Sequence, residues 1–310
     1  MKVVFLGTPS FAVPSLKAIV AKHEVVAVVC QPDKVGSRGK TEYSPVKKFA
    51  LSHGLKLFQF EKISRDGVET LKDLHPDIMV TAAYGQILSD EVIAIASHGI
   101  VNVHGSLLPE LRGAAPIQYA VWQGLAETGI TILQTIKKVD AGDMILQKKL
   151  RILPYETNGE LFERMAALGA EAIVEALYQI ENGTATFTPQ DESKATFCKK
   201  ISAEQEKIDW NFPAEQVINL VRALSPAPGA WTTYNGSRLK IFALTKCETS
   251  FEGVPGQVVE CGKKTLAVLC GDKKAVYVQK LQAENAKCLD IVSFLCGKKI
   301  AVGTVLGQDE

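Results

Sequence analysis

The chain has 310 residues, of which 46% are hydrophobic and 22% charged, and its formal net charge is +1. This length suggests two domains, and the composition is that of a globular chain with a full core, which excludes a disordered one. Its apolar runs fall far short of the ~20 residues of a membrane-spanning helix, and the seven scattered cysteines form no C-x-x-C pair, so we expect a soluble, cytoplasmic protein with reduced thiols.

The first half of the chain alternates between short apolar runs and helical patterns. Strand-like runs occur at residues 3–6, 25–30, 78–82, 100–104, 131–135 and 144–150, and helical patterns at 9–21, 46–52, 68–74 and about 159–181. Such alternation is typical of βαβ units. We therefore predict an α/β fold with a doubly wound, mainly parallel, Rossmann-like sheet, which places ligands beyond the carboxyl ends of its strands.

The second half of the chain has a different pattern of polar and apolar residues. Residues 189–207 are polar and lack a long apolar stripe, which predicts a linker between a first domain at 1–188 and a second at 208–310. Beyond a helical pattern at 214–224, five short strand-like runs are separated by turn pairs such as Asn235-Gly236, and 288–295 favours a closing helix. This spacing predicts a small OB-like β-barrel.

Charge is uneven along the chain. Residues 193–308 carry 16 Lys and Arg against 10 Asp and Glu. Two interpretations remain open, namely surface lysines that confer solubility and a basic field for a polyanion.

Several motif-like stretches lack the residues that their chemistry needs. Gly7-Thr8-Pro9-Ser10 follows the first strand but has one glycine, too few for a dinucleotide fingerprint. Gly39-Lys40-Thr41 lacks the earlier glycine and the preceding strand of a P-loop. The histidines and cysteines have no metal-ligand spacing, so we expect no metal.

The most informative residues lie in the run at 100–104 and directly after it. Because side chains alternate along a strand, Asn102 and His104 share one face at its carboxyl end. A carboxylate, Asp140, lies in a later glycine-containing turn, and the three could together polarise, protonate and orient a substrate. The alternative is a hydrogen-bonded core histidine beside a turn-forming asparagine.

These stretches resemble the methionyl-tRNA formyltransferase family over nearly the whole chain. The resemblance is carried by the following motifs: Asn102-x-His104-Gly105-Ser106-Leu107-Leu108-Pro109, Arg112-Gly113-Ala114-Ala115-Pro116-Ile117-Gln118, Asp140-x-Gly142-Asp143, Gln31-Pro32-Asp33 with Arg38-Gly39-Lys40, and Ser225-Pro226-Ala227-Pro228-Gly229-Ala230-Trp231. It implies formyl transfer from 10-formyltetrahydrofolate to the α-amino group of methionyl initiator tRNA, without a metal and by a chain that acts as a monomer.

The resemblance also implies roles for particular residues. It makes Asn102, His104 and Asp140 catalytic, and Arg38 and Lys40 contacts for tRNA, unless they merely form a solvated loop. The folate contacts that it implies are Ser106, Leu107, Leu108 and Pro109, together with the backbone of Tyr84, Gln86, Ile87 and Leu88. For Ile87 and Leu88, a place in the core is the alternative.

Two rival functions remain at this point. A formyltransferase that acts on a small amine, such as glycinamide ribonucleotide or an amino sugar, would share the chemistry but would keep its activity without the second domain. A non-catalytic tRNA-binding protein would share the architecture, but the intact Asn102, His104 and Asp140 argue against it.

Overall fold

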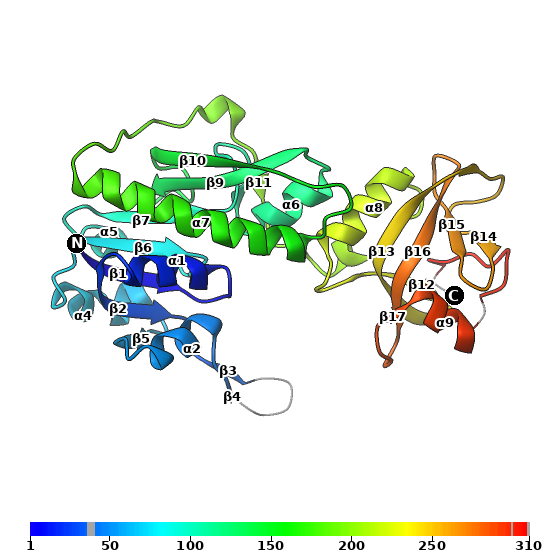
Figure 1. The fold of residues 1–310 in the computed structure, drawn as a ribbon, viewed down its shortest axis with the longest axis horizontal. Coiled ribbons are helices and arrows are strands. Elements are labelled where there is room, and N and C mark those ends of the chain that lie inside the picture. Colours follow the sequence, from blue (N-terminus) through cyan, green and yellow to red (C-terminus); the bar gives the residue numbers. More distant parts are fainter. Residues whose placement is uncertain (36–40, 299, 309–310) are drawn as a thin grey trace. The chain divides into compact units, whose positions relative to one another are not determined.

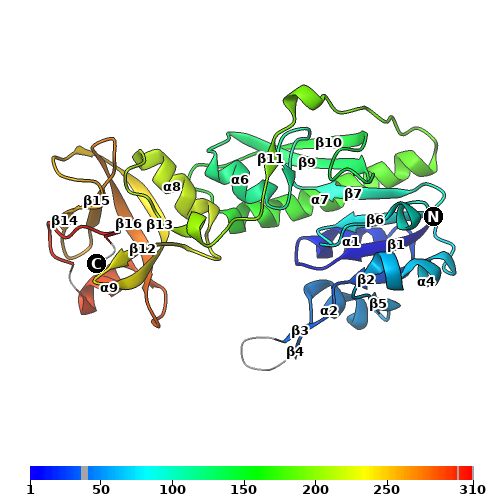
Figure 2. The same ribbon diagram turned by 180° about the vertical axis from the view of Figure 1, so that it is seen from behind.

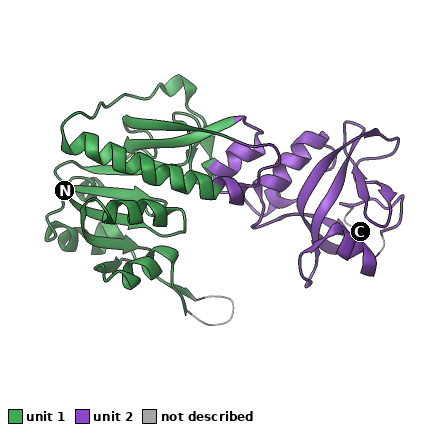
Figure 3. Ribbon diagram, in the orientation of Figure 1, with its two compact units in different colours: residues 1–116, 127–151, 162–198 green, residues 117–126, 152–161, 199–310 purple. Residues whose placement is uncertain are grey.

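The computed structural model describes residues 1–35, 41–298 and 300–308, and the chain divides into two compact units (Figure 3). Unit 1 comprises residues 1–116, 127–151 and 162–198, and unit 2 comprises residues 117–126, 152–161 and 199–310. Each has a hydrophobic core of its own. Among the described residues, no helix combines the length and the apolarity needed to cross a membrane.

Unit 1 is built on a seven-stranded sheet in the order β10-β9-β7-β6-β1-β2-β5 (Figure 1). Its strands are β1 (Lys2–Gly7), β2 (Glu24–Cys30), β5 (Leu57–Gln59), β6 (Ile78–Ala82), β7 (Ile100–His104), β9 (Glu127–Gln134) and β10 (Met144–Arg151). Neighbouring strands from β5 to β7 pair in parallel, and β9 is antiparallel to both β7 and β10. The predicted mainly parallel sheet is confirmed.

Helices cover both faces of this sheet. They are α1 (Ala12–Val20), α2 (Pro45–Ser52), α3 (Ile63–Asp66), α4 (Val68–Lys72), α5 (Asp90–Ile93) and the long α7 (Asn158–Glu181). Gly169 of α7 lies against Val103 of β7, whereas Ile100 of β7 packs in a core cluster with Leu71 of α4 and Val92 of α5. Because side chains alternate along β7, the face that carries Ile100 also carries Asn102 and His104.

After α7 the chain returns along β10, the edge strand of the sheet (Figures 1 and 2). We call residues 188–198 the return strap. Thr188 forms a bridge with Met144, the short helix η1 (Glu192–Lys194) follows, and β11 (Phe197–Cys198) pairs in parallel with β8 (Arg112–Gly113). Residues 190–198 lie in the stretch predicted as a linker, and they are hydrogen-bonded within unit 1.

Unit 2 is an antiparallel sheet with helices α6 (Pro116–Trp122), α8 (Ala214–Ala223) and α9 (Ile291–Gly297), and a short turn of helix, η2 (Glu204–Glu206). Its strands are β12 (Ala230–Tyr234), β13 (Ser237–Ser250), β14 (Val258–Cys261), β15 (Leu266–Leu269), β16 (Lys274–Ala283) and β17 (Leu289–Asp290). The paired order runs from β12 through β13, β16 and β15 to β14.

The two edges of this sheet are joined by the last part of the chain. The Val258 amide of β14 donates to the Thr304 carbonyl (2.8 Å), and the Gly307 amide donates to the Thr233 carbonyl of β12 (3.0 Å). Residues 304–307 therefore bridge β14 and β12 and close the sheet on itself. This closure agrees with the small barrel predicted for the second half.

Candidate active site

Asn102 and His104 lie at the carboxyl end of β7, where the pattern of the strand places them. The Thr81 hydroxyl of β6 donates to Asn102 Oδ1 (2.9 Å), which fixes the orientation of the amide. Asn102 Nδ2 then donates to Asp140 Oδ1 (3.3 Å), which uses one of its two N–H groups and leaves the other without an acceptor in the described part of the chain.

Asp140 reaches this point from the turn between β9 and β10. Its carboxylate accepts the Gly113 amide N–H at Oδ2 (2.9 Å), and the same oxygen lies 3.6 Å from His104 Nδ1. The Asp140 side chain is only 12% exposed. The structure thus brings together the three residues that the sequence proposes as catalytic.

The His104 ring is held in place through its Nε2 nitrogen. Nε2 lies 3.0 Å from the Leu111 carbonyl oxygen, and because a carbonyl only accepts, Nε2 carries a hydrogen and donates it. The 3.6 Å separation of Nδ1 from Asp140 exceeds a normal hydrogen bond. Nδ1 is therefore the ring nitrogen left to interact with a ligand that enters beside the carboxylate.

The pairing of β8 with β11 directs the Gly113 amide towards Asp140. Arg112 N–H donates to the Thr196 carbonyl and Ala114 N–H to the Cys198 carbonyl, both at 2.9 Å, and the intervening N–H points the opposite way. Gly113 has a φ of +124°, and a Cβ there would lie 2.2 Å from Cys198 O. Glycine is thus required at this position by both the backbone and the space.

The loop of residues 106–109 directly follows β7. Ser106 and Leu108 are buried, whereas Leu107 and Pro109 are half-buried. The loop is tied to β9 and β10, because Thr131 Oγ1 donates to the Ser106 carbonyl (2.7 Å) and Gln147 Nε2 donates to the Leu108 carbonyl (2.9 Å). These four residues form one fixed wall beside His104.

Residues 84–88 follow β6, the neighbour of β7. Tyr84 and Leu88 belong to the core, and burial raises the pKa of the Tyr84 phenol, whose hydroxyl has no hydrogen-bond partner among the described residues. Gln86 is fixed by hydrogen bonds with Ile63 N–H (2.8 Å) and the Phe60 carbonyl (2.9 Å). Ile87 differs from the others, because its side chain is 79% exposed.

The exposed Ile87 lines a pocket of about 310 Å³, together with Glu61, Lys62, Ser64 and Gln86. An apolar side chain beside an ammonium group and a hydroxyl suits a flat ring that carries polar substituents. Of the proposed folate contacts, Ile87 and Gln86 therefore line a cavity, whereas the Tyr84 and Leu88 side chains are part of the core.

Arg38 and Lys40 lie outside the described residues. Next to them in sequence, β3 (Lys34–Val35) and β4 (Thr41–Glu42) pair as an antiparallel hairpin. Lys47 of α2 forms an ion pair with Asp33 and donates to Gln59 Oε1 (2.8 Å). These contacts fasten the start of the hairpin to unit 1.

Comparison with known proteins finds matches over nearly the whole chain. A family model described as formyl transferase matches residues 1–177, and one described as its C-terminal domain matches residues 200–299. The methionyl-tRNA formyltransferase of Acetivibrio thermocellus is 42% identical, covering 99% of this chain and 100% of that protein. That of Latilactobacillus sakei is 44% identical, covering 99% and 98%. The chain belongs to the methionyl-tRNA formyltransferase family.

The fold extends to other formyltransferases. A crystal structure of an N-formyltransferase from Helicobacter canadensis, in complex with folinic acid and dTDP-3-aminofucose, superposes with a TM-score of 0.70. It covers 91% of this chain and 99% of that one at 18% identity, so it shows a shared fold.

The return strap supplies polar side chains that sequence analysis did not single out in this formyltransferase. Gln190 and Glu192 hydrogen-bond to Arg112, whose side chain is 1% exposed. Hydrogen bonds from Arg112 and then Lys138 lower the pKa of Glu192 to about 2. In the sequence, these side chains had one signal, which was Arg112 within a motif. An arginine that is buried by its loop needs hydrogen-bond acceptors from elsewhere in the chain.

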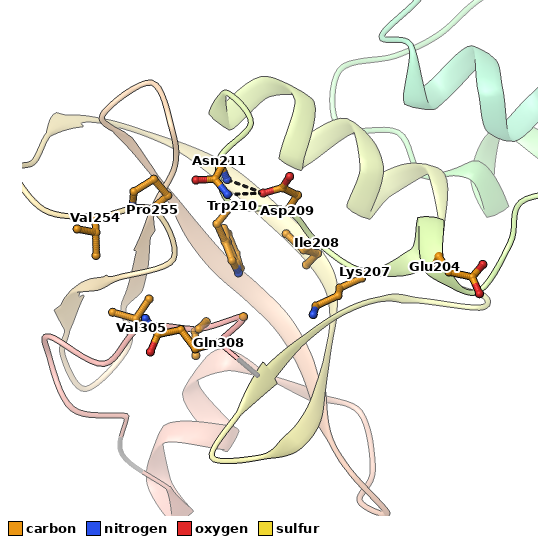
Figure 4. A pocket seen from close by; sticks show the side chains of 12 residues that line it. Glu204, Lys207, Ile208, Asp209, Trp210, Asn211, Val254, Pro255, Val305 and Gln308 are labelled. Atoms are coloured by element: carbon orange, nitrogen blue, oxygen red, sulfur yellow. Dashed lines mark hydrogen bonds between the residues drawn. The ribbon is translucent and has the colours of Figure 1, made fainter. Parts of the chain in front are cut away.

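Unit 2 has a pocket of its own, of about 670 Å³ (Figure 4). It lies between residues 207–211, the loop at Val254 and Pro255, and the closing segment 305–308. Trp210 points into it, while Asp209 is hydrogen-bonded to Asn211 within its own loop.

No group of three or more His, Cys, Asp or Glu among the described residues could hold a metal ion.

Proposed function

We propose that this chain transfers the formyl group of 10-formyltetrahydrofolate to the α-amino group of methionyl initiator tRNA, giving N-formylmethionyl-tRNA for translation initiation. The observation that carries the proposal is the convergence of Asn102, His104 and Asp140 at the carboxyl end of β7, in a chain of this family. When bound, 10-formyltetrahydrofolate supplies the formyl carbon on its N10.

Asn102 has the donor for the formyl oxygen. Negative charge grows on that oxygen as the amine attacks, and the free N–H of Nδ2 can stabilise it. A preorganised donor of this kind is worth ~10²–10³ in rate. Thr81 and Asp140, which hold the two ends of the amide, keep that N–H in place before the substrate arrives.

His104 and Asp140 move the protons. The amine loses a proton as its bond to the formyl carbon forms, and N10 gains one as its bond breaks. Asp140 accepts the first, directly or through water, and passes it to His104 Nδ1, which delivers it to N10 while Nε2 stays bound to Leu111. Because the 3.6 Å between Asp140 Oδ2 and His104 Nδ1 exceeds a hydrogen bond, the proton crosses through a water or after a small shift of the two side chains.

The residues around β6 and β7 fit the folate. Ile87 offers an exposed apolar surface beside the 310 Å³ pocket, and residues 106–109 form a second wall after His104. Lys62, which lines the same pocket, can pair with a carboxylate of the folate tail. We assign the binding of the ring system to Ile87 and to residues 106–109.

Unit 2 and the hairpin after β2 would contact the tRNA. The excess of Lys and Arg in residues 193–308 suits a phosphate backbone, and Arg38 and Lys40 would reach the unpaired acceptor end. We infer that the chain acts in the cytoplasm, where its proposed tRNA substrate enters translation. We also infer that it acts as a monomer, because the proposed catalytic groups all come from one unit of one chain.

One assay tests the function against its rivals. Purified protein is incubated with 10-formyltetrahydrofolate and Met-tRNA, the ester is hydrolysed, and N-formylmethionine is measured, with an Asp140→Ala variant as the control. We expect product from the wild type and almost none from the variant. Formylation of glycinamide ribonucleotide or an amino sugar in preference to Met-tRNA would favour a small-amine enzyme, and tRNA binding without any transfer would favour a binding protein.

A further inference from the structure

Gln190 of the return strap is bonded on both sides of its amide. Nε2 donates to the backbone carbonyls of Asp140 (2.9 Å) and Gly142 (2.8 Å). Oε1 accepts from Nε (3.0 Å) and Nη2 (2.8 Å) of Arg112. Because a guanidinium only donates and a carbonyl only accepts, this amide can have a single orientation.

The turn that Gln190 holds needs support from outside. Asp140 has a φ of +51°, a left-handed conformation that residues other than glycine rarely adopt and that persists only where the surroundings fix it. The turn also lies tightly against β9, since a Cβ on Gly142 would be 1.9 Å from Gln134 O. Gln190 binds two backbone carbonyls of this turn, whereas Gly113 and Asn102 bind the Asp140 carboxylate.

Arg112 connects that support to the other partner of Asp140. Its buried guanidinium binds Gln190 and also Glu192 (2.8 and 3.2 Å), while the next residue, Gly113, donates its N–H to the Asp140 carboxylate. The pair Arg112-Gly113 therefore fixes Asp140 in two ways. Gly113 binds the carboxylate directly, and Arg112 holds Gln190, which binds the backbone of the turn.

We infer that Gln190 is a positioning residue for Asp140, which sets the turn of residues 140–142 so that the carboxylate faces Asn102 and His104. Among the described residues, the Gln190 side chain hydrogen-bonds with Arg112 and this turn, and not with the proposed catalytic side chains. The inference rests on the proposed function, because it assigns Gln190 a part in the same reaction.

The first test is Gln190→Met, which keeps the length of the side chain and removes all four hydrogen bonds. Because small misplacements of a catalytic group are costly, we expect kcat to fall about tenfold or more. The KM values for 10-formyltetrahydrofolate and Met-tRNA should stay within about threefold, since the substrate contacts remain. Gln179→Met is the matched control, because it makes the same substitution at a half-buried position on α7 that has no part in the proposed site, and it should leave kcat unchanged.

A double-mutant cycle separates positioning from general stability. In an Asp140→Asn background, measured by single turnover with excess enzyme, Gln190→Met should cost less than about twofold, because the group it positions has already been removed. An equal loss in both backgrounds, or full kcat in the single variant, would overturn the inference. If Gln190→Met does not fold, Gln190→Asn takes its place in the cycle, because its amide is too short to reach both Arg112 and the turn.

The same assay separates the two proposals. Wild-type protein that forms no N-formylmethionyl-tRNA would overturn the proposed function and this inference together. Active wild-type protein alongside a fully active Gln190→Met variant would overturn the inference alone.

Discussion

Asn102 is held at both ends of its amide, which leaves one N–H for the reaction. We therefore expect Asn102→Ala to lower kcat by ~10²–10³, the usual effect of losing one preorganised donor. The KM for Met-tRNA should change little, because the bond is made to the reacting oxygen. Steady-state kinetics with both substrates provides the measurement.

Thr81→Val is the matched control for that prediction. It keeps the shape of the side chain and removes the bond to Asn102 Oδ1, so the amide stays in the site with its orientation less fixed. We expect a smaller loss than for Asn102→Ala, about five- to tenfold, the worth of one neutral hydrogen bond. A value of kcat for Asn102→Ala within about tenfold of the wild type would remove Asn102 from the proposed role.

For Tyr84 we expect a substitution that leaves activity unchanged, in contrast to those at Asn102 and Thr81. Its hydroxyl is buried without a partner, which is unfavourable, so Tyr84→Phe should leave stability unchanged or raise it by up to about 1 kcal/mol. The KM for 10-formyltetrahydrofolate should stay the same, because the ring lies in the core. Thermal melting and kinetics check both points, with the exposed Tyr178→Phe as control. A clear rise in that KM would show that the hydroxyl meets the ligand.

At the scale of elements, strand β7 could be predicted from the sequence, and the return strap could not. The alternation of Asn102 and His104 with valines is a local pattern that fixes which side chains share a face. The bond from Gln190 to Asp140 joins residues 50 positions apart, and it leaves no local pattern. A polar stretch such as 189–198 looks the same in sequence whether its side chains face water or a buried arginine.

The strap should show a defined pH dependence at Glu192. Hydrogen bonds from Arg112 and Lys138 hold the pKa of Glu192 at about 2, below its usual value of 4.5. The unfolded chain therefore binds more protons at this group between those two values. Its contribution to stability is fully present above pH 4.5 and is lost as the pH falls towards 2.

Glu192→Gln tests this dependence. We expect its Tm to lie below that of the wild type at pH 7, and the two values to converge as the pH falls from 4.5 towards 2. Glu163→Gln, in an exposed position on α7, is the matched control. A difference between Glu192→Gln and wild type that is the same at every pH would contradict the ion pair with Arg112.

At the scale of the whole molecule, the sequence predicted two parts, and it missed how the chain is shared between them. Unit 2 includes residues 117–126 and 152–161, which lie inside the first half of the sequence. Its barrel is closed by residues 304–307, whose partners at 258 and 233 are far away along the chain. Both features depend on contacts between distant segments, whereas periodicity reports only neighbours.

Charge allows the last prediction at this scale. Residues 193–308 carry 16 basic against 10 acidic residues, so binding of tRNA should release counterions from its phosphates. The logarithm of KM for Met-tRNA should then rise linearly with the logarithm of the salt concentration, while kcat at saturation stays nearly constant.

Arg238, which lies over the Trp231 ring at 4.3 Å, offers a cation and an aromatic face together on β12 and β13. Arg238→Gln should lower the slope by about 1 if that cation meets a phosphate. Lys17→Gln, exposed on α1 in unit 1, should leave the slope unchanged, and a KM that does not respond to salt would contradict electrostatic binding altogether.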